Sequence, residues 1–175
     1  NSLVLVERGS SGQQRMRMLE TIREFAADRL RESGDEEETR RGHAAYFDQF
    51  VQSIRPLFSG SRTPEAMLLL DDEWENIEAT VAPRVAARDF EPLVEIASAT
   101  WRYVWLSDRV RDATAWMPFA YEARGELEPR LRGELCRIWG SSLYQLGRYE
   151  DARVALEEAV DLLAESGSPD REAWA

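Results

Sequence analysis

The residues of this sequence that could perform chemistry are few, and their spacing matches no catalytic or metal-binding pattern. The chain has one histidine, His43, and one cysteine, Cys136, too few for a zinc site with nitrogen and sulfur ligands. His43 has no neighbouring nucleophile motif, which favours a structural or surface role. Cys136 lies one helical turn before Trp139, with no group nearby that would lower its pKa, so we expect it to be buried as a small apolar residue.

The carboxylates likewise show no catalytic arrangement. The run from Asp35 to Glu38 lacks the alternating spacing and the glycine of a calcium loop, whereas negative charge at a helix start is favoured by the helix dipole. Asp71 and Glu75 would share one helix face, but their surroundings indicate a charged surface. Because the chain contains no lysine, a phosphate-binding GxxxxGK(S/T) loop cannot occur in it. We therefore expect no enzyme activity, catalytic residue, metal ion or cofactor.

Aromatic residues are the one feature that suggests a binding function. Trp101 and Trp105 are four residues apart, so they share a helix face and become neighbours. Most aromatic residues at helical spacing belong to a core. The alternative is an aromatic-lined groove for a ligand or peptide, with arginine as the charged complement. The groove predicted on this basis consists of Trp101, Arg102, Trp105, Arg109 and Tyr144.

A helix-turn-helix pattern near the C-terminal end gives the strongest architectural signal. Small residues stand where two antiparallel helices would approach closely: Gly140, Gly147, Ala152 and Ala159. Larger residues occupy the positions between them: Trp139, Leu143, Leu146, Tyr149 and Leu156. This pattern is typical of tetratricopeptide-like repeats, which stack into solenoids and present a surface to a partner.

A degenerate copy of the pattern lies upstream. Val110, Ala113 and Met117 precede Tyr149, Ala152 and Leu156 at a constant interval, which we call the repeat spacing. It is longer than the roughly 34 residues of the standard unit. Pro118 falls inside the second helix of this copy, where we expect it to bend the helix.

Local patterns predict a β-hairpin followed only by helices. Alternation over Leu3–Glu7 and Arg15–Leu19, on either side of a glycine- and serine-rich turn, indicates the hairpin. Gly34 predicts the end of the first helix, and Thr63 with Pro64 predicts the start of another, with Thr63 as its N-cap.

Further signals predict where the later helices are interrupted or begin. Asp35 with Glu38 resembles a capping pair. We expect a break near Asp71-Asp72, and a kink or a junction at Pro83. The resulting fold class is all-α, an antiparallel helix-pair, right-handed solenoid of tetratricopeptide-like type with a short N-terminal β-hairpin.

The composition excludes several classes of partner. The chain has 33 acidic residues against 22 basic ones, a net charge of −11, which argues against direct nucleic-acid binding. No stretch approaches the ~18 consecutive apolar residues of a membrane span, and no signal segment opens the chain. We expect a cytoplasmic location and no membrane partner. The abrupt start and the helical pattern at the end suggest a fragment of a larger protein.

Three segments together resemble a known family. Arg15–Ala26 is similar to the stretch that closes the winged-helix domain of bacterial signal-transduction NTPases, the large transcriptional regulators of the AfsR, MalT, LuxR and SARP types. His43–Phe47 resembles their next helix. Glu73–Ile77 resembles the helix that leads into their repeat array.

The resemblance implies a domain organisation and a mechanism. It implies the end of a winged-helix domain over 1–33, a helical linker or capping region over 34–88, and truncated tetratricopeptide-like repeats over 89–175. In such a regulator the repeats would bind a protein or small-molecule signal. They would then control a nucleotide-binding core outside this chain, and the winged helix would pack on that core instead of reading DNA.

Two other functions remain open. The first is a free-standing adaptor whose acidic repeats dock a basic peptide or another protein. The second is an accessory domain of an enzyme, or a hydrolase with Asp/Glu chemistry, which would need carboxylates converging in a closed pocket. A nucleotide-binding loop upstream in the parent gene would favour the regulator over the adaptor.

Overall fold

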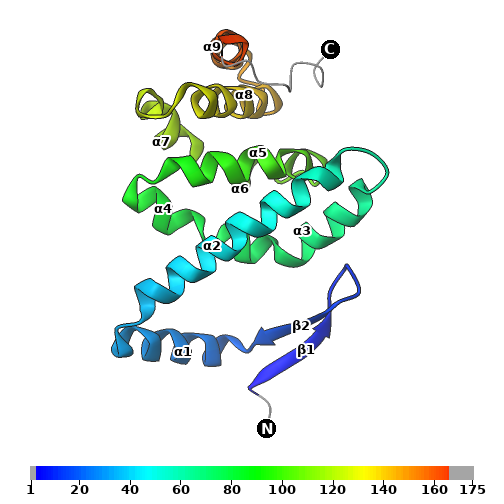
Figure 1. Cartoon of the computed structure of the whole chain (residues 1–175), viewed down its shortest axis with the longest axis vertical. Coiled ribbons are helices and arrows are strands. Elements are labelled where there is room, and N and C mark those ends of the chain that lie inside the picture. The colour runs from blue at the N-terminus through cyan, green and yellow to red at the C-terminus, as the bar shows by residue number, and fades with distance from the viewer. Residues whose placement is uncertain (1–2, 166–175) are drawn as a thin grey trace. The chain divides into compact units, whose positions relative to one another are not determined.

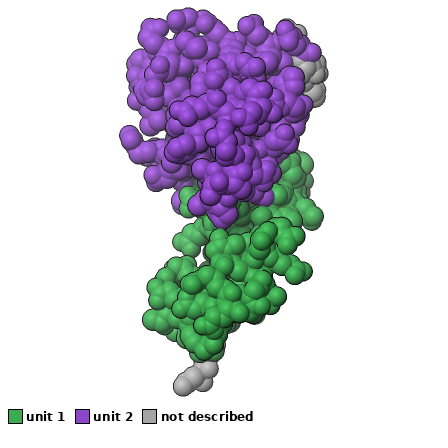
Figure 2. Space-filling view, turned by 90° about the vertical axis from the view of Figure 1, so that its left-hand side faces the viewer, with its two compact units in different colours: residues 1–80 green, residues 81–175 purple. Residues whose placement is uncertain are grey.

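The computed structural model describes residues 3–165, which fold mostly into helices after a short antiparallel hairpin (Figure 1). The helical class and the N-terminal hairpin predicted from the sequence are therefore confirmed. The chain divides into two compact units, Asn1–Thr80 and Val81–Ala175 (Figure 2). The domain boundaries predicted after residues 33 and 88 separate functional parts of a regulator, and they stay predictions.

The first unit opens with the hairpin, in which β1 (Val4–Arg8) pairs with β2 (Gln14–Met18). The register places Val4 opposite Met18 and Val6 opposite Met16. Gly12 adopts a left-handed backbone, with φ of 82°, a conformation that glycine reaches without a steric cost. The hairpin therefore forms where the alternating pattern predicts it.

Helices make up the remainder of the first unit. They are α1 (Glu20–Ser33), α2 (Glu36–Ile54), the 3-10 turn η1 (Arg55–Phe58) and α3 (Thr63–Glu78). Gly34 ends α1 with φ of 81°, as predicted. The core comes from α2, η1 and α3, and its buried apolar side chains are Phe47, Val51, Ile54, Phe58, Ala66, Leu70, Trp74 and Ile77.

Two local predictions for this unit are wrong, and a third is confirmed only in part. Asp35 is the N-cap residue of α2, as predicted, but its side chain makes no capping bond. The Thr63 hydroxyl donates backwards to the carbonyl of Gly60 at 3.1 Å, so Thr63 is the first helical residue and not an N-cap. The break expected at Asp71-Asp72 is absent, because α3 runs unbroken from Thr63 to Glu78. Asp72 is buried, and its carboxylate accepts hydrogen bonds from the hairpin turn.

The second unit is a succession of helices. They are α4 (Val81–Ala87), α5 (Phe90–Leu106), α6 (Val110–Ala113), α7 (Met117–Glu122), the 3-10 turn η2 (Arg124–Glu126), α8 (Pro129–Gln145) and α9 (Tyr149–Glu165). Pro83 lies in the first turn of α4, at a junction between helices, as predicted. Pro118 is the second residue of α7. The helix predicted around it is thus divided into α6 and α7.

Helices α8 and α9 form the antiparallel pair that the repeat pattern predicts. An added Cβ at Gly140 would lie 2.7 Å from Cγ of Leu156, and one at Gly133 would lie 2.9 Å from Leu163. Ala152 and Ala159 are buried at the same contact. Gly147 serves a different purpose from the predicted close approach. Its φ of 78° turns the chain between the helices.

The turn between α8 and α9 repeats the turn between α5 and α6. Asp108, which precedes Gly147 by the repeat spacing, also has a positive φ, of 57°. The amide of Arg109 donates to the carbonyl of Val104, and at the same spacing the amide of Arg148 donates to the carbonyl of Leu143. The two helix pairs therefore share one turn geometry at the spacing expected from the sequence.

Candidate functional site

Trp101 and Trp105 lie near the C-terminal end of α5 and contact each other. Their rings meet edge to face, with centroids 5.7 Å apart. Trp101 is only 7% exposed, whereas Trp105 is 41% exposed. Trp101 is therefore part of the core and fixes the ring beside it, so any partner would contact mainly Trp105.

Both predicted arginines are exposed and are close to the tryptophan pair in the sequence. Arg102 follows Trp101 on α5, and Arg109 precedes α6. The guanidinium of Arg109 lies 5.9 Å from the centre of the Tyr103 ring, and Tyr103 is fully buried. This cation–π contact directs the Arg109 side chain over the end of α5.

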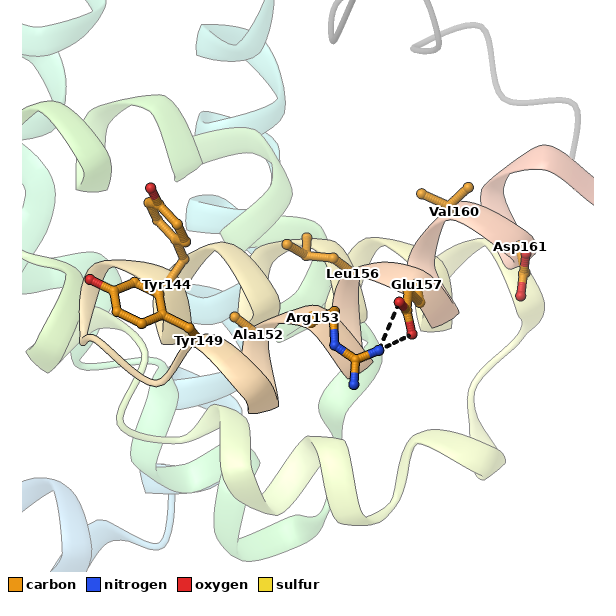
Figure 3. Close-up of a pocket in the computed structure, with 8 residues that line it drawn as sticks. All are labelled: Tyr144, Tyr149, Ala152, Arg153, Leu156, Glu157, Val160 and Asp161. Atoms are coloured by element: carbon orange, nitrogen blue, oxygen red, sulfur yellow. Dashed lines mark hydrogen bonds and ion pairs between the residues drawn. The ribbon is translucent and has the colours of Figure 1, made fainter.

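Tyr144, the last of the predicted residues, belongs to a different feature. Its ring meets that of Tyr149 edge to face at 5.4 Å, across the turn between α8 and α9. The two tyrosines form one end of an open groove of about 720 Å³ along α9 (Figure 3). The described residues that line the groove are Tyr144, Tyr149, Ala152, Arg153, Leu156, Glu157, Val160 and Asp161.

The groove has an apolar floor and a charged rim. Ala152 and Leu156 form the floor, and Val160 is 67% exposed beside them. On the rim, Arg153 donates to both oxygens of Glu157, at 2.9 and 3.1 Å (Figure 3). Because this ion pair is exposed, it contributes little to stability. The groove therefore offers mainly apolar and aromatic contact.

A second ion cluster holds α9 from its other side. The carboxylate of Glu158 accepts from Nε of Arg124 at 3.0 Å and from Nε of Arg132 at 2.8 Å. Desolvation by burial raises the pKa of Glu158, but the bonds from Arg132 and Arg124 outweigh it, and the net pKa is lowered. This cluster fixes α9 against η2 and α8.

Cys136 lies in α8 near this cluster and is completely buried. Burial raises the pKa of its thiol to about 12, with a smaller contribution from Glu158. A thiol with this pKa stays protonated at neutral pH and is a poor nucleophile. The predicted burial of Cys136 is confirmed.

The first unit contains a polar contact that the sequence did not reveal. Asp72 on α3 accepts from the amides of Ser10 and Ser11, at 2.5 and 3.0 Å, and from the Ser11 hydroxyl at 2.5 Å. An added Cβ at Gly9 would overlap the carboxylate of Asp72. The glycine therefore permits the turn to approach α3 this closely.

The structure thus distributes the predicted site residues over two features. It brings together Trp101 and Trp105, and Tyr144 pairs with Tyr149, which the prediction omitted. The groove residues of α9 could have been found from the sequence, because they follow Tyr149 at the i+3, i+4, i+7, i+8 and i+11 spacing of one helix face. Asp72 carried no such signal.

The described residues contain neither a membrane span nor a metal site. Within residues 3–165, no helix is sufficiently long and apolar to cross a bilayer, and no group of three or more His, Cys, Asp or Glu side chains is placed to hold a metal ion. No protein-family model matches the chain, and neither the curated proteins nor the solved structures contain a significant match.

Proposed function

We propose that this chain is the regulatory region of a bacterial transcriptional regulator, a tetratricopeptide-like, right-handed helical array that receives a signal in the cytoplasm. The resemblance of Arg15–Ala26, His43–Phe47 and Glu73–Ile77 to signal-transduction NTPases supports this function. The repeated turn of the second unit supports the repeat architecture. The region itself has no enzymatic role, and the nucleotide-binding core that it controls belongs to another part of the regulator.

One observation supports a binding surface on the repeats. Trp105 and Tyr144 occupy the same position in the two helix pairs, separated by the repeat spacing, and both are exposed, at 41% and 59%. In the sequence Arg102 precedes Trp105 by three residues and Arg109 follows it by four. Exposed aromatic and arginine side chains are the residue types that most often dominate the energetics of protein interfaces. We call Arg102, Trp105, Arg109 and Tyr144 the aromatic row, a name that refers to their positions in the repeat pattern, since Tyr144 lies in the groove on α9 and not beside Trp105 in one pocket.

The openness of the aromatic row favours a protein segment over a small-molecule signal. Small ligands usually bind in concave sites that bury about 70–90% of their surface, whereas these side chains stand exposed. The two arginines in the row would favour acidic groups on the partner. This preference differs from that of the free-standing adaptor, whose net negative charge would recruit a basic peptide.

The signal would act by binding two states of the regulator with different affinities. A partner that binds one state tenfold more tightly shifts the equilibrium by about 1.4 kcal/mol. Such a partner would therefore change the state of the nucleotide-binding core without any chemistry in this region.

Site-specific photo-crosslinking in cells tests this function. A photoreactive phenylalanine analogue is placed at position 105 or 144 of the parent protein. A third variant carries it at Phe119, which is also an exposed aromatic residue but lies outside the aromatic row. We expect one discrete protein adduct from positions 105 and 144 and none from 119. We also expect Arg102→Glu with Arg109→Glu to abolish it. Equal adducts at all three positions would contradict the proposal.

A further inference from the structure

The groove on α9 follows one face of a helix. Its lining runs from Tyr149 to Asp161 at i, i+3, i+4 and i+7 spacing. At a rise of about 1.5 Å per residue, this stretch of α9 is about 18 Å long. Tyr144 and Tyr149 lie at one end of it and Asp161 lies at the other (Figure 3). The groove therefore offers a partner a contact of about three helical turns.

The backbone along the groove favours a helical partner over an extended one. The amide and carbonyl groups of the floor belong to the hydrogen-bonded ladder of α9, so an extended segment would find no backbone partners there. A helix satisfies its own backbone hydrogen bonds and needs only side-chain contact. The second unit already contains contact of this kind, because α8 packs against both α6 and α7.

The charge of α9 favours a basic partner. The helix has a single basic residue, Arg153, against carboxylates at Glu150, Asp151, Glu157, Glu158, Asp161 and Glu165. Arg153 is bound to Glu157 at 2.9 Å and lies 3.5 Å from Glu150, so the rim of the groove is acidic overall. A second copy paired symmetrically through this groove would bring an equally acidic helix against the first, with like-charge repulsion. Lysine or arginine beside the apolar face of a partner helix would be attracted instead.

The tyrosine pair gives a second reason for a basic partner. Tyr144 is 59% exposed and Tyr149 is 62% exposed, and their rings meet edge to face. Ring surface is therefore open to a guanidinium or ammonium group, which the face of a tyrosine ring attracts.

We propose that the groove on α9 binds a basic amphipathic helix of a partner protein. Apolar side chains at i, i+4 and i+7 of that helix cover Ala152, Leu156 and Val160, and its basic side chains meet the tyrosine pair and Asp161. This inference is separate from the signal-binding proposal, which favours acidic groups on the partner. The two surfaces share only Tyr144, and the variants that test the groove leave the aromatic row unchanged.

Fluorescence anisotropy with two designed peptides tests the groove at physiological salt. Both peptides are labelled, alanine-based helices of about 20 residues, long enough to be helical in water, with leucine at i, i+4, i+7 and i+11. One carries arginine beside the leucines, and the other carries glutamate at the same positions. The 175-residue chain is compared with Val160→Arg and with its matched control, Val154→Arg. Both valines are exposed on α9, at 67% and 53%, but of the two only Val160 lines the groove.

The arginine peptide should bind about tenfold more tightly than the glutamate peptide. Val160→Arg should weaken its binding about tenfold, because a charge then enters the apolar contact, whereas Val154→Arg should change it less than about twofold. Asp161→Arg, at an exposed position of the rim, should weaken it about fivefold. Circular dichroism verifies that each variant is folded.

Three results would overturn the proposal. The first is equal affinity for the two peptides, or no binding of either. The second is an equal loss of affinity in Val160→Arg and Val154→Arg. The third is a dimer in sedimentation velocity that Val160→Arg alone dissociates, which would show that a second copy occupies the groove.

Discussion

Asp108 and Gly147 are separated by the repeat spacing and hold the same left-handed backbone conformation, with φ of 57° and 78°. Each ends the first helix of a pair, and the next residue donates its amide to a carbonyl five residues earlier. Two copies of one turn thus connect α5 to α6 and α8 to α9. Glycine is the residue type best suited to this conformation. Gly147 therefore adopts it without strain, whereas Asp108 does not.

Exchanging residues at these two turns should change stability in opposite directions. Asp108→Gly should raise the free energy of unfolding by about 0.5 kcal/mol, because glycine adopts a positive φ without strain. Gly147→Ala should lower it by about 1 kcal/mol for the same reason. Asp161→Gly, inside α9, is the control and should lower it by about 0.5–1 kcal/mol. Urea denaturation measures all three. A loss of stability in Asp108→Gly as large as in the control would refute this reading of the turn.

The close contact between α8 and α9 predicts the effect of a single added methyl group. Gly140→Ala should lower the free energy of unfolding by about 1–3 kcal/mol, because the new Cβ would overlap Leu156 and lie 3.2 Å from the carbonyl oxygen of Ala152. The control is Gly125→Ala, whose Cβ would meet no described atom within 4 Å. In thermal melts, Gly140→Ala should have a clearly lower melting temperature than Gly125→Ala. Identical melting temperatures would show that α8 and α9 move apart at little cost to accommodate the methyl group.

Acid should release the hairpin from α3. Desolvation raises the pKa of Asp72, but hydrogen bonds from Ser11 and Ser10 and the charge of Arg15 outweigh it, so the pKa lies below its ordinary value of 3.8. The contact is therefore fully stabilising above about pH 4 and is lost as the pH falls through the lowered pKa. The amide NMR shifts of Ser10 and Ser11 should follow this titration.

Replacing Asp72 should weaken the same contact at neutral pH. Asp72→Asn should lower the local stability of the hairpin by about 2 kcal/mol, since the amides lose a charged acceptor. Hydrogen exchange in β1 and β2 measures this loss. Glu75→Gln, at an exposed position of the same helix, serves as the control and should leave exchange unchanged. If both variants behave alike, Asp72 does not hold the hairpin.

Two neighbouring glutamates of α9 should differ in their effect on stability. Glu158→Gln should cost about 2 kcal/mol, because Glu158 accepts from both Arg124 and Arg132 and is only 19% exposed. Glu157→Gln should cost less than about 0.5 kcal/mol, because its bond with Arg153 is exposed. Denaturant titration at pH 7 compares the two. Similar losses in the free energy of unfolding would show that the hydrogen bonds of Glu158 do not stabilise the packing of α9.

The fold was predictable where local patterns determine it. The hairpin, the cap at Gly34 and the pair α8–α9 follow from alternation, a left-handed glycine and small residues at helical spacing. The sequence alone did not predict the contact between Asp72 and the hairpin turn, because it joins residues 61 and 62 positions apart. Without knowledge of this distant contact, two adjacent aspartates suggested a break in the helix. In the structure α3 is unbroken, and the buried carboxylate of Asp72 accepts hydrogen bonds from Ser10 and Ser11.

The candidate site was only partly predictable. The spacing of Trp101 and Trp105 correctly implied their contact, but which ring would be exposed depends on the packing around α5. Tyr149 seemed to be a repeat core residue because its counterpart, Val110, occupies a core position. In the structure Val110 is buried, whereas Tyr149 is 62% exposed, so two residues at equivalent positions of the pattern differ in their surroundings.

The most direct test of the proposed regulatory function is the sequence of the parent gene upstream of the codon for Asn1. The regulatory function predicts a GxxxxGK(S/T) phosphate-binding loop there, followed by a strand that ends in an acidic residue for Mg²⁺. An upstream sequence without a nucleotide-binding site would contradict the regulator and would favour a free-standing adaptor.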